Sequence, residues 1–333
     1  MATISRRAFL AGSTALILAP HVAEAQQQGK VYRLGCLWAV PAPLAAPYRA
    51  SLEAGLRDLG WLAGQNVLVE HRFPDSPADV PRLAASVVTA RVDVIVAFTN
   101  PVVAAAASAT TEIPIVMVYG ADPIGSGFAV SFARPGKNIT GMTFDTSPEL
   151  FGKHLELLKE IMPRVKRVQI LRNPDWYATP SHRVYITTVE TAARSLQLPI
   201  FFSDVRNAID IERVIRGIGK PGTSAIYAIP DAFVTFQHGS LIAELARKHG
   251  LPSMFGQREP VEAGGLASYG PDTLAMPRYA ASFVDRLFRG ARASELPIEQ
   301  PTKFELVINL KTAKALGLTI PPLLLGRADE VIQ

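Results

Sequence analysis

Cysteine is nearly absent from this sequence, because Cys36 is the only one among 333 residues. A single thiol cannot close an internal disulfide, so a disulfide-stapled fold is excluded, and so is a zinc site built from several cysteines. Cys36 lies within an apolar run of a predicted strand, so we interpret it as a buried structural thiol rather than a nucleophile.

Motifs for catalysis, metal binding and nucleotide binding are also missing. The six histidines show no H-E-x-x-H spacing, and neither G-x-S-x-G nor G-x-x-x-x-G-K-[ST] occurs. Residues 217–222 match G-x-G-x-x-G, but they follow a predicted helix and precede a strand, so we interpret them as a helix C-terminal turn. We therefore predict no catalytic residues, no metal and no cofactor, and we expect His154 and His249 to lie on helix surfaces.

The basic residues do not form clusters. Lys and Arg number 34 against 29 Asp and Glu, a net charge of +5, but no basic block or basic stretch with interleaved aromatics occurs. Nucleic acid is therefore not an expected partner.

Long apolar runs are limited to one short stretch near the N-terminus. Arg6 and Arg7 precede an apolar segment at 11–20, and a small-residue cleavage motif ends at Ala25. The segment is too short to span a bilayer and predicts a twin-arginine-type signal peptide over residues 1–25, with an ordinary signal peptide as the alternative. We expect cleavage after about Ala25 and a periplasmic location. Because no cysteine follows that site, we expect no direct membrane anchor.

From Val31 onward, short apolar runs alternate with longer amphipathic ones, a pattern that predicts parallel sheets in an α/β architecture. The predicted strands of the first half are Val31–Ala39, Asn66–Phe73, Val92–Thr99, Ile113–Gly120 and Ile139–Phe144, and its helices are Leu44–Gly60, Ala78–Ala90 and Asn100–Thr110.

The same alternation then starts again. A helix is predicted to begin at Ser147, where a serine cap precedes a proline. The predicted strands of this half are Arg167–Asn173, Pro199–Ser203, Thr223–Pro230 and Leu251–Gly256, and its further helices are Pro180–Leu196, Asn207–Gly217 and Phe233–His249. Two similar doubly wound lobes are therefore predicted.

The chain continues with a predicted strand at Leu266–Gly270, a helix at Thr273–Arg289 and a strand at Lys303–Asn309. Such additional elements predict three crossings between the lobes, near 144–148, 268–271 and 290–297, which form a three-segment hinge. We accordingly assign residues 26–145 and 270–292 to an N-terminal lobe, and 146–269 and 293–333 to a C-terminal lobe.

The candidate ligand-binding residues follow from strand ends, because ligands of open α/β sheets bind beyond the carboxyl ends of the strands. Aromatic rings there could stack a planar or apolar solute, and a few polar groups could fix its charged ends. These residues are Trp38, Thr99, Asn100, Tyr119, Asp122, Asn173, Trp176, Asp231, Glu259 and Tyr269. The alternative is that they are ordinary loop residues chosen for turn formation.

Five stretches have a sequence typical of a known family. They are Gly64–Val67, Ile113–Val116, Ala133–Gly141, Ala263–Gly270 and the tail Gln300–Leu318, which is the most specific of them. Together they resemble the ABC-transporter substrate-binding family related to tryptophan- and tyrosine-binding proteins. The resemblance covers essentially the whole chain. One departure is the aromatic stretch at 173–177, where many relatives carry Asn-Pro-x-Asn-Pro, and it favours an aromatic or otherwise apolar solute.

The resemblance implies a type I periplasmic-binding-protein fold and a solute-capture function. Such a protein takes up a small solute between its lobes and delivers it to a permease in the inner membrane, whose ATPase lies on the far side. We expect a monomer that is not an enzyme. The alternatives are an exported sensory ligand-binding protein and a periplasmic enzyme.

Overall fold

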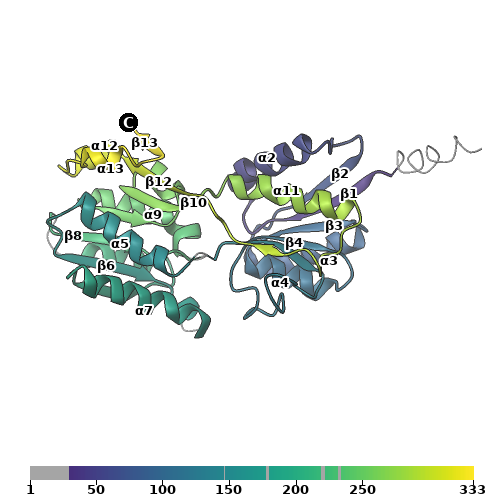
Figure 1. The fold of residues 1–333 in the computed structure, drawn as a ribbon, viewed down its shortest axis with the longest axis horizontal. Helices are drawn as coiled ribbons and strands as arrows, with labels where there is room; N and C mark the ends of the chain where they lie inside the picture. The colour runs from purple at the N-terminus through teal and green to yellow at the C-terminus, as the bar shows by residue number, and fades with distance from the viewer. Residues whose placement is uncertain (1–29, 146, 178–179, 219–221, 232–233) are drawn as a thin grey trace, which may run out of the picture.

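The computed structural model describes residues 30–145, 147–177, 180–218, 222–231 and 234–333. The predicted signal peptide, with Arg6, Arg7 and Ala25, lies outside this part, as do residues 219–221 of the 217–222 motif. Two lobes lie side by side along the long axis, and each contains a mainly parallel sheet covered by helices (Figure 1). The two-lobed α/β architecture predicted from the sequence is therefore confirmed.

The sheet of the first lobe, within the described residues, has the strand order β11-β5-β4-β3-β1-β2, and its pairs are parallel. Its strands are β1 (Tyr32–Leu37), β2 (Val67–Arg72), β3 (Val94–Phe98), β4 (Ile115–Gly120), β5 (Ile139–Thr143) and β11 (Ile298–Glu299). The helical segments of this lobe are α2 (Ala42–Asp58), η1 (Pro77–Asp79), α3 (Val80–Thr89), α4 (Asn100–Ala109) and α11 (Ala275–Phe288).

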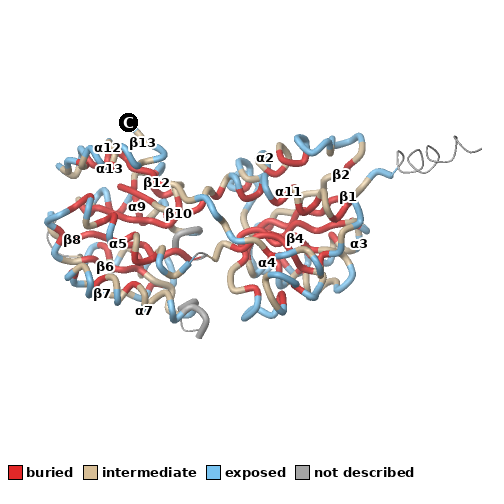
Figure 2. The backbone as a smooth tube through the Cα atoms, viewed as in Figure 1, coloured by how far each residue is buried: buried red, intermediate tan, exposed pale blue. Residues whose placement is uncertain are grey.

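Helices cover both faces of this sheet. Every residue of β3 is buried, as expected for a central parallel strand (Figure 2). Helices α2 and α11 pack together on one face, where a Cβ added to Gly55 would lie 2.3 Å from the carbonyl oxygen of Arg278. The other face is covered by α3 and α4.

The second lobe has the strand order β13-β12-β10-β9-β8-β6-β7 within the described residues, and only β12 runs antiparallel to a neighbour, β10. Its strands are β6 (Arg167–Arg172), β7 (Ile200–Asp204), β8 (Ser224–Ala228), β9 (Ser253–Phe255), β10 (Ala267–Pro271), β12 (Phe304–Asn309) and β13 (Glu330–Ile332). Its helices are α5 (Glu149–Ile161), α6 (Pro174–Tyr177), α7 (Pro180–Ser195), α8 (Ala208–Gly217), α9 (Val234–Lys248), α10 (Glu259–Glu262), α12 (Leu310–Ala315) and α13 (Pro322–Leu325).

The lobe boundaries differ from the expected ones in the last third of the chain. Strand β10 belongs to the second sheet through Pro271, so residues 270 and 271 lie in the second lobe. Ile298 pairs with Gly141 in the first sheet, so the expected assignment of 293–299 to the C-terminal lobe is wrong. The chain therefore returns to the second lobe between Glu299 and Phe304. The sequence did not predict β11, because a strand of two residues is too short to give a recognisable pattern.

Most predicted elements are present, and two local expectations have clear outcomes. Helix α8 ends at Gly217 and β8 begins at Ser224, so the glycine-rich motif follows a helix and precedes a strand, as interpreted. The expected surface position of His154 is wrong, because this side chain is fully buried between α5 and the second sheet. No helix within the described residues is long and apolar enough to cross a membrane.

Candidate functional site

Aromatic side chains follow the carboxyl edge of the first sheet from strand to strand. Ring centroids are 5.8 Å apart for Phe73 and Trp38, 4.0 Å for Trp38 and Phe98, 6.0 Å for Phe98 and Tyr119, and 6.4 Å for Tyr119 and Phe144. These residues belong to β2, β1, β3, β4 and β5 or directly follow them, which is the spatial order of the sheet. We call these five residues the aromatic row.

The middle of the aromatic row is more deeply buried than its ends. Trp38 and Phe98 are each 3% exposed and Tyr119 is 7% exposed, whereas Phe73 and Phe144 are partly exposed. Trp38 therefore presents almost no open ring surface in the structure. Its ring lies nearly parallel to that of Phe98, with an interplanar angle of 11°, and packs in the buried middle of the row.

Tyr119 enters the aromatic row because the backbone of β4 departs from regular alternation. Met117 packs on the α3 and α4 face, and alternation would place Tyr119 there as well. The pairing of β4 with β5 instead shifts register between Met117 and Gly120, and Tyr119 has a φ of 57°. This irregularity directs the ring to the other face, where its hydroxyl donates a 2.5 Å hydrogen bond to the carbonyl oxygen of Thr273.

Thr99 and Asn100 hold the backbone at the same edge. Thr99 has a φ of 69° and a ψ of 157°, a conformation that L-residues rarely adopt. The side chain of Asn100 accepts a hydrogen bond from the N–H of Ala121 and donates one to its carbonyl oxygen, both at 2.7 Å. Asn100 therefore fixes the loop after β4, and its amide is engaged within the protein.

Two acidic residues, Asp122 and Asp145, are in contact next to the aromatic row. The backbone N–H of Asp122 donates a 2.5 Å hydrogen bond to Asp145 Oδ2. Burial, together with the nearby charge of Asp122, raises the pKa of Asp145 to about 6, despite the hydrogen bonds that Asp145 accepts. Among the described residues, neither carboxylate forms an ion pair with a cation.

Tyr185 of the second lobe is a further candidate, and the strand-end rule misses it because it lies within α7. Its ring stacks on Phe151 with centroids 4.6 Å apart. Burial, and then the charges of Asp145 and Asp122, raise the pKa of its hydroxyl. A charge effect of this kind requires proximity, so Tyr185 brings an aromatic ring and a hydroxyl from the second lobe toward Asp145 of the first.

The second-lobe candidates have varied surroundings. Asn173 accepts a 3.1 Å hydrogen bond from the N–H of Asp175 at the start of α6, and Asp231 is buried after β8. Trp176 belongs to α6, but its side chain lies outside the described part. Tyr269 is half-buried in β10, and its carbonyl oxygen lies 2.5 Å from His154 Nε2.

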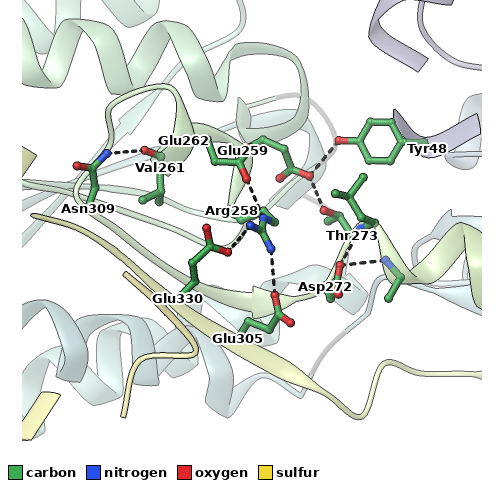
Figure 3. Close-up of polar contacts among 12 residues, drawn as sticks. Tyr48, Arg258, Glu259, Val261, Glu262, Asp272, Thr273, Glu305, Asn309 and Glu330 are labelled. Atoms are coloured by element: carbon green, nitrogen blue, oxygen red, sulfur yellow. Dashed lines mark hydrogen bonds and ion pairs between the residues drawn. The ribbon is translucent and has the colours of Figure 1, made fainter. Parts of the chain in front are cut away.

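Glu259 bridges the lobes through bonds within the protein (Figure 3). Tyr48 of α2 donates a 2.9 Å hydrogen bond to Glu259 Oε1, and the hydroxyl of Thr273 donates to the same oxygen. The preceding residue, Arg258, contacts carboxylates of α10, β12 and β13, which are those of Glu262, Glu305 and Glu330. Glu259 is thus held at the junction of the lobes, where its Oε1 is occupied by Tyr48 and Thr273.

This arrangement is suited to binding a solute. Rings from both lobes can contact an apolar body, and the carboxylates of Asp122 and Asp145 in the first lobe can contact a cationic group. Within the part of the chain that the structure describes, no group of three or more His, Cys, Asp and Glu side chains is placed to hold a metal ion.

Comparison with known proteins gives consistent matches over most of the chain. A family model for ABC transporter substrate binding proteins matches residues 40–332. A tyrosine-binding protein of Clostridioides difficile (strain R20291) is 23% identical over 266 residues, which cover 79% of this chain and 74% of that protein.

Solved structures share the fold. A conserved domain protein from Vibrio cholerae O1 biovar El Tor has a TM-score of 0.78 at 27% identity, covering 91% of this chain and 100% of that one. An ABC domain from Streptococcus pneumoniae in complex with L-Trp has a TM-score of 0.78 at 23% identity, covering 90% and 99%. These likenesses confirm the expected fold of type I periplasmic binding proteins.

Proposed function

This chain belongs to the ABC transporter substrate-binding protein family, whose members are non-enzymatic transporter components, and on that premise we propose that its solute is a small aromatic compound with a protonated amine. The family resemblance inferred from the sequence is thereby confirmed. The solute would lie between the lobes, against the carboxyl edge of the first sheet.

The aromatic row is the observation that carries this proposal. Its five rings cross five adjacent strands at the edge where solutes of open α/β sheets bind. Tyr185 adds a ring from the second lobe. A planar solute placed between Tyr185 and the row would bury its ring against aromatic surfaces when the lobes approach.

The neighbouring carboxylates support a cationic group on the solute. Asp122 and Asp145 lie together without a cationic partner among the described residues, and burial already disfavours the charge on Asp145. An ammonium group would relieve this cost by supplying an opposite charge and hydrogen-bond donors.

Two relatives are consistent with this chemistry. The Clostridioides difficile relative is a tyrosine-binding protein, and the Streptococcus pneumoniae structure contains L-Trp. Both solutes combine an aromatic ring with an amine, which are the two features that the residues of this chain would recognise.

We also propose the cellular setting. The paired arginines, the apolar segment and the cleavage motif support export to the periplasm, with the signal removed after about Ala25. The solute-bound protein would then deliver its solute to an inner-membrane permease driven by an ATPase.

Isothermal titration of the purified protein tests the solute proposal. L-Tryptophan or L-tyrosine should bind with a clear heat signal and raise the melting temperature, because a ligand that binds only the folded state stabilises it. Indole-3-propionate, which keeps the ring and carboxylate but lacks the amine, should bind at least about tenfold more weakly, a difference of about 1.4 kcal/mol. Equal binding of indole-3-propionate would refute the amine requirement, and equal binding of L-leucine would refute the aromatic one.

A further inference from the structure

A chain of hydrogen bonds joins the aromatic row to a titratable pair behind it. The indole Nε1 of Trp38 lies 3.1 Å from His71 Nδ1. On the other side of the imidazole, His71 Nε2 lies 3.2 Å from Glu53 Oε1. Trp38 follows β1, His71 lies in β2 and Glu53 lies in α2, so three elements of the first lobe contribute to the chain.

The indole of Trp38 determines which ring nitrogen of His71 carries the proton. An indole N–H can only donate, so Nδ1 of His71 must accept and cannot carry a proton. The imidazole proton therefore resides on Nε2 and is donated to the Glu53 carboxylate. This arrangement exists only while His71 is neutral, because the imidazolium would direct a second N–H at the indole N–H.

The surroundings of His71 favour the neutral form at neutral pH. Burial lowers the pKa of His71, and the charges of Arg49 on α2 and Arg72 on β2 act in the same direction. Glu53, the carboxylate that faces the ring from α2, opposes them. Arg72 is itself bound to Glu70, and Arg49 lies 3.7 Å from Glu53.

Because Trp38 packs between other rings of the aromatic row, its orientation affects their positions. Its ring stacks on Phe98 with centroids 4.0 Å apart and on Phe73 with centroids 5.8 Å apart, and it is almost completely buried. His71 also stacks on Phe73, at 5.8 Å. A rotation of the Trp38 indole would therefore displace rings on both sides of it in the aromatic row.

We propose that His71 and Glu53 are positioning residues that set the orientation of Trp38 and thereby the shape of the aromatic surface that receives the solute. The inference rests on the proposed function, since it concerns the same binding surface. Neither residue needs to contact the solute. Protonation of His71 in acid would release the indole and loosen the aromatic row.

Glutamine at position 71 provides a discriminating variant. Its amide oxygen can accept from the indole N–H while its NH2 group donates to Glu53, so H71Q keeps both hydrogen bonds but cannot titrate. Leucine has a similar size and offers neither group, so H71L leaves the buried indole N–H without an acceptor.

The first measurement is made without solute. In uniformly 15N-labelled protein, the indole N–H resonance of Trp38 is identified by its loss in W38F. Its chemical shift should follow an acid titration in the wild type and should stay constant in H71Q. A Trp38 resonance that ignores pH in the wild type would overturn the proposal, and so would one that titrates equally in H71Q.

The second measurement is the affinity for L-tryptophan at neutral pH. H71Q should bind within about threefold of the wild type, and H71L should bind about tenfold more weakly. Equal affinities for H71L and H71Q would overturn the proposal. If the wild type binds no aromatic amine, the proposed function fails, whereas the solute-free titration still decides whether His71 holds Trp38.

Discussion

The hydroxyl of Tyr48 and the carboxylate of Glu259 join the two lobes through a hydrogen bond of 2.9 Å. Tyr48 lies on α2 of the first lobe and Glu259 begins α10 of the second. The Tyr48 ring also meets the edge of Tyr119, with centroids 6.1 Å apart. The interlobe contact is therefore adjacent to the aromatic row, so lobe movement and the binding surface are physically connected.

Substituting Phe for Tyr48 should loosen the lobes without unfolding them. The ring remains to pack, but the bond to Glu259 is lost, at a cost of about 1 kcal/mol. We expect small-angle X-ray scattering of the solute-free protein to indicate a broader range of interlobe separations. The matched control is Y279F, because Tyr279 donates a comparable 2.6 Å hydrogen bond to Glu299 within the first lobe. Identical scattering from both variants would contradict the interlobe role of Tyr48.

Buried His154 should make the protein less stable in acid. Its Nε2–H donates to the carbonyl oxygen of Tyr269 and its Nδ1 accepts from the hydroxyl of Tyr227, at 2.5 and 2.7 Å. Burial lowers the pKa of His154 from its usual 6.5 to about 4. The unfolded chain therefore binds the proton more readily than the folded one, and stability that is complete above pH 6.5 is lost as the pH falls toward 4.

The expected loss is about 3 kcal/mol by the lower end of that window, measured by urea unfolding at a series of pH values. H154Q should flatten this part of the pH dependence, whereas the control H249Q should retain the decline of the wild type. A decline that persists unchanged in H154Q would assign the acid sensitivity to other groups.

The sequence was sufficient for those parts of the site that depend on regular alternation. Trp38 continues the alternation of Leu34 and Cys36 in β1, and all three pack in the same core cluster. Tyr119 could not be placed in this way, because a register shift in β4 redirects its ring. Alternation is a local property, whereas this irregularity arises from pairing with β5.

Residues that depend on distant partners were missed for the same reason. The charged neighbours of His154 on α5 suggest a surface residue, but its partners are Tyr227 and Tyr269, 73 and 115 residues away. Tyr185 lies within a helix and approaches Asp145 only because the two lobes face each other. Sequence periodicity determines which face of an element is apolar, but it does not determine which element of the other lobe that face meets.

Asn in place of Asp145 should make the protein more stable and a weaker binder. Because the folded-state pKa of Asp145 is raised from 3.8 to about 6, its charge costs stability above pH 6, and this cost disappears as the pH falls toward 3.8. D145N should therefore gain about 3 kcal/mol at neutral pH and little in acid. Affinity for L-tryptophan should fall at neutral pH, because the amine loses its negatively charged partner.

The control for this substitution is D75N, since Asp75 is exposed and lies outside the site. Its unfolding free energy and its affinity should both stay near those of the wild type. Unchanged tryptophan binding by D145N would remove Asp145 from the proposed ammonium site, even if the stability gain is observed.

Trp38 should report solute binding although its ring is buried. The chain has three tryptophans, and Trp61 packs against Tyr32 and Phe288, where its Nε1–H donates a 3.0 Å hydrogen bond to Asp285. In the double variant W61F/W176F, Trp38 is the remaining fluorophore. The indole can be excited without exciting L-tyrosine. Binding of L-tyrosine should shift the emission of Trp38, because a ring bound on the aromatic row changes the packing around the indole.

The reciprocal variant W38F/W176F keeps Trp61 as the fluorophore, and L-tyrosine should leave its emission nearly unchanged. W38F should also weaken binding by about 1–2 kcal/mol, because phenylalanine cannot donate to His71 and fills less of the row. A response from Trp61 equal to that from Trp38 would indicate that binding perturbs the whole lobe. Absence of a response from Trp38, with binding confirmed by calorimetry, would place the solute away from the aromatic row.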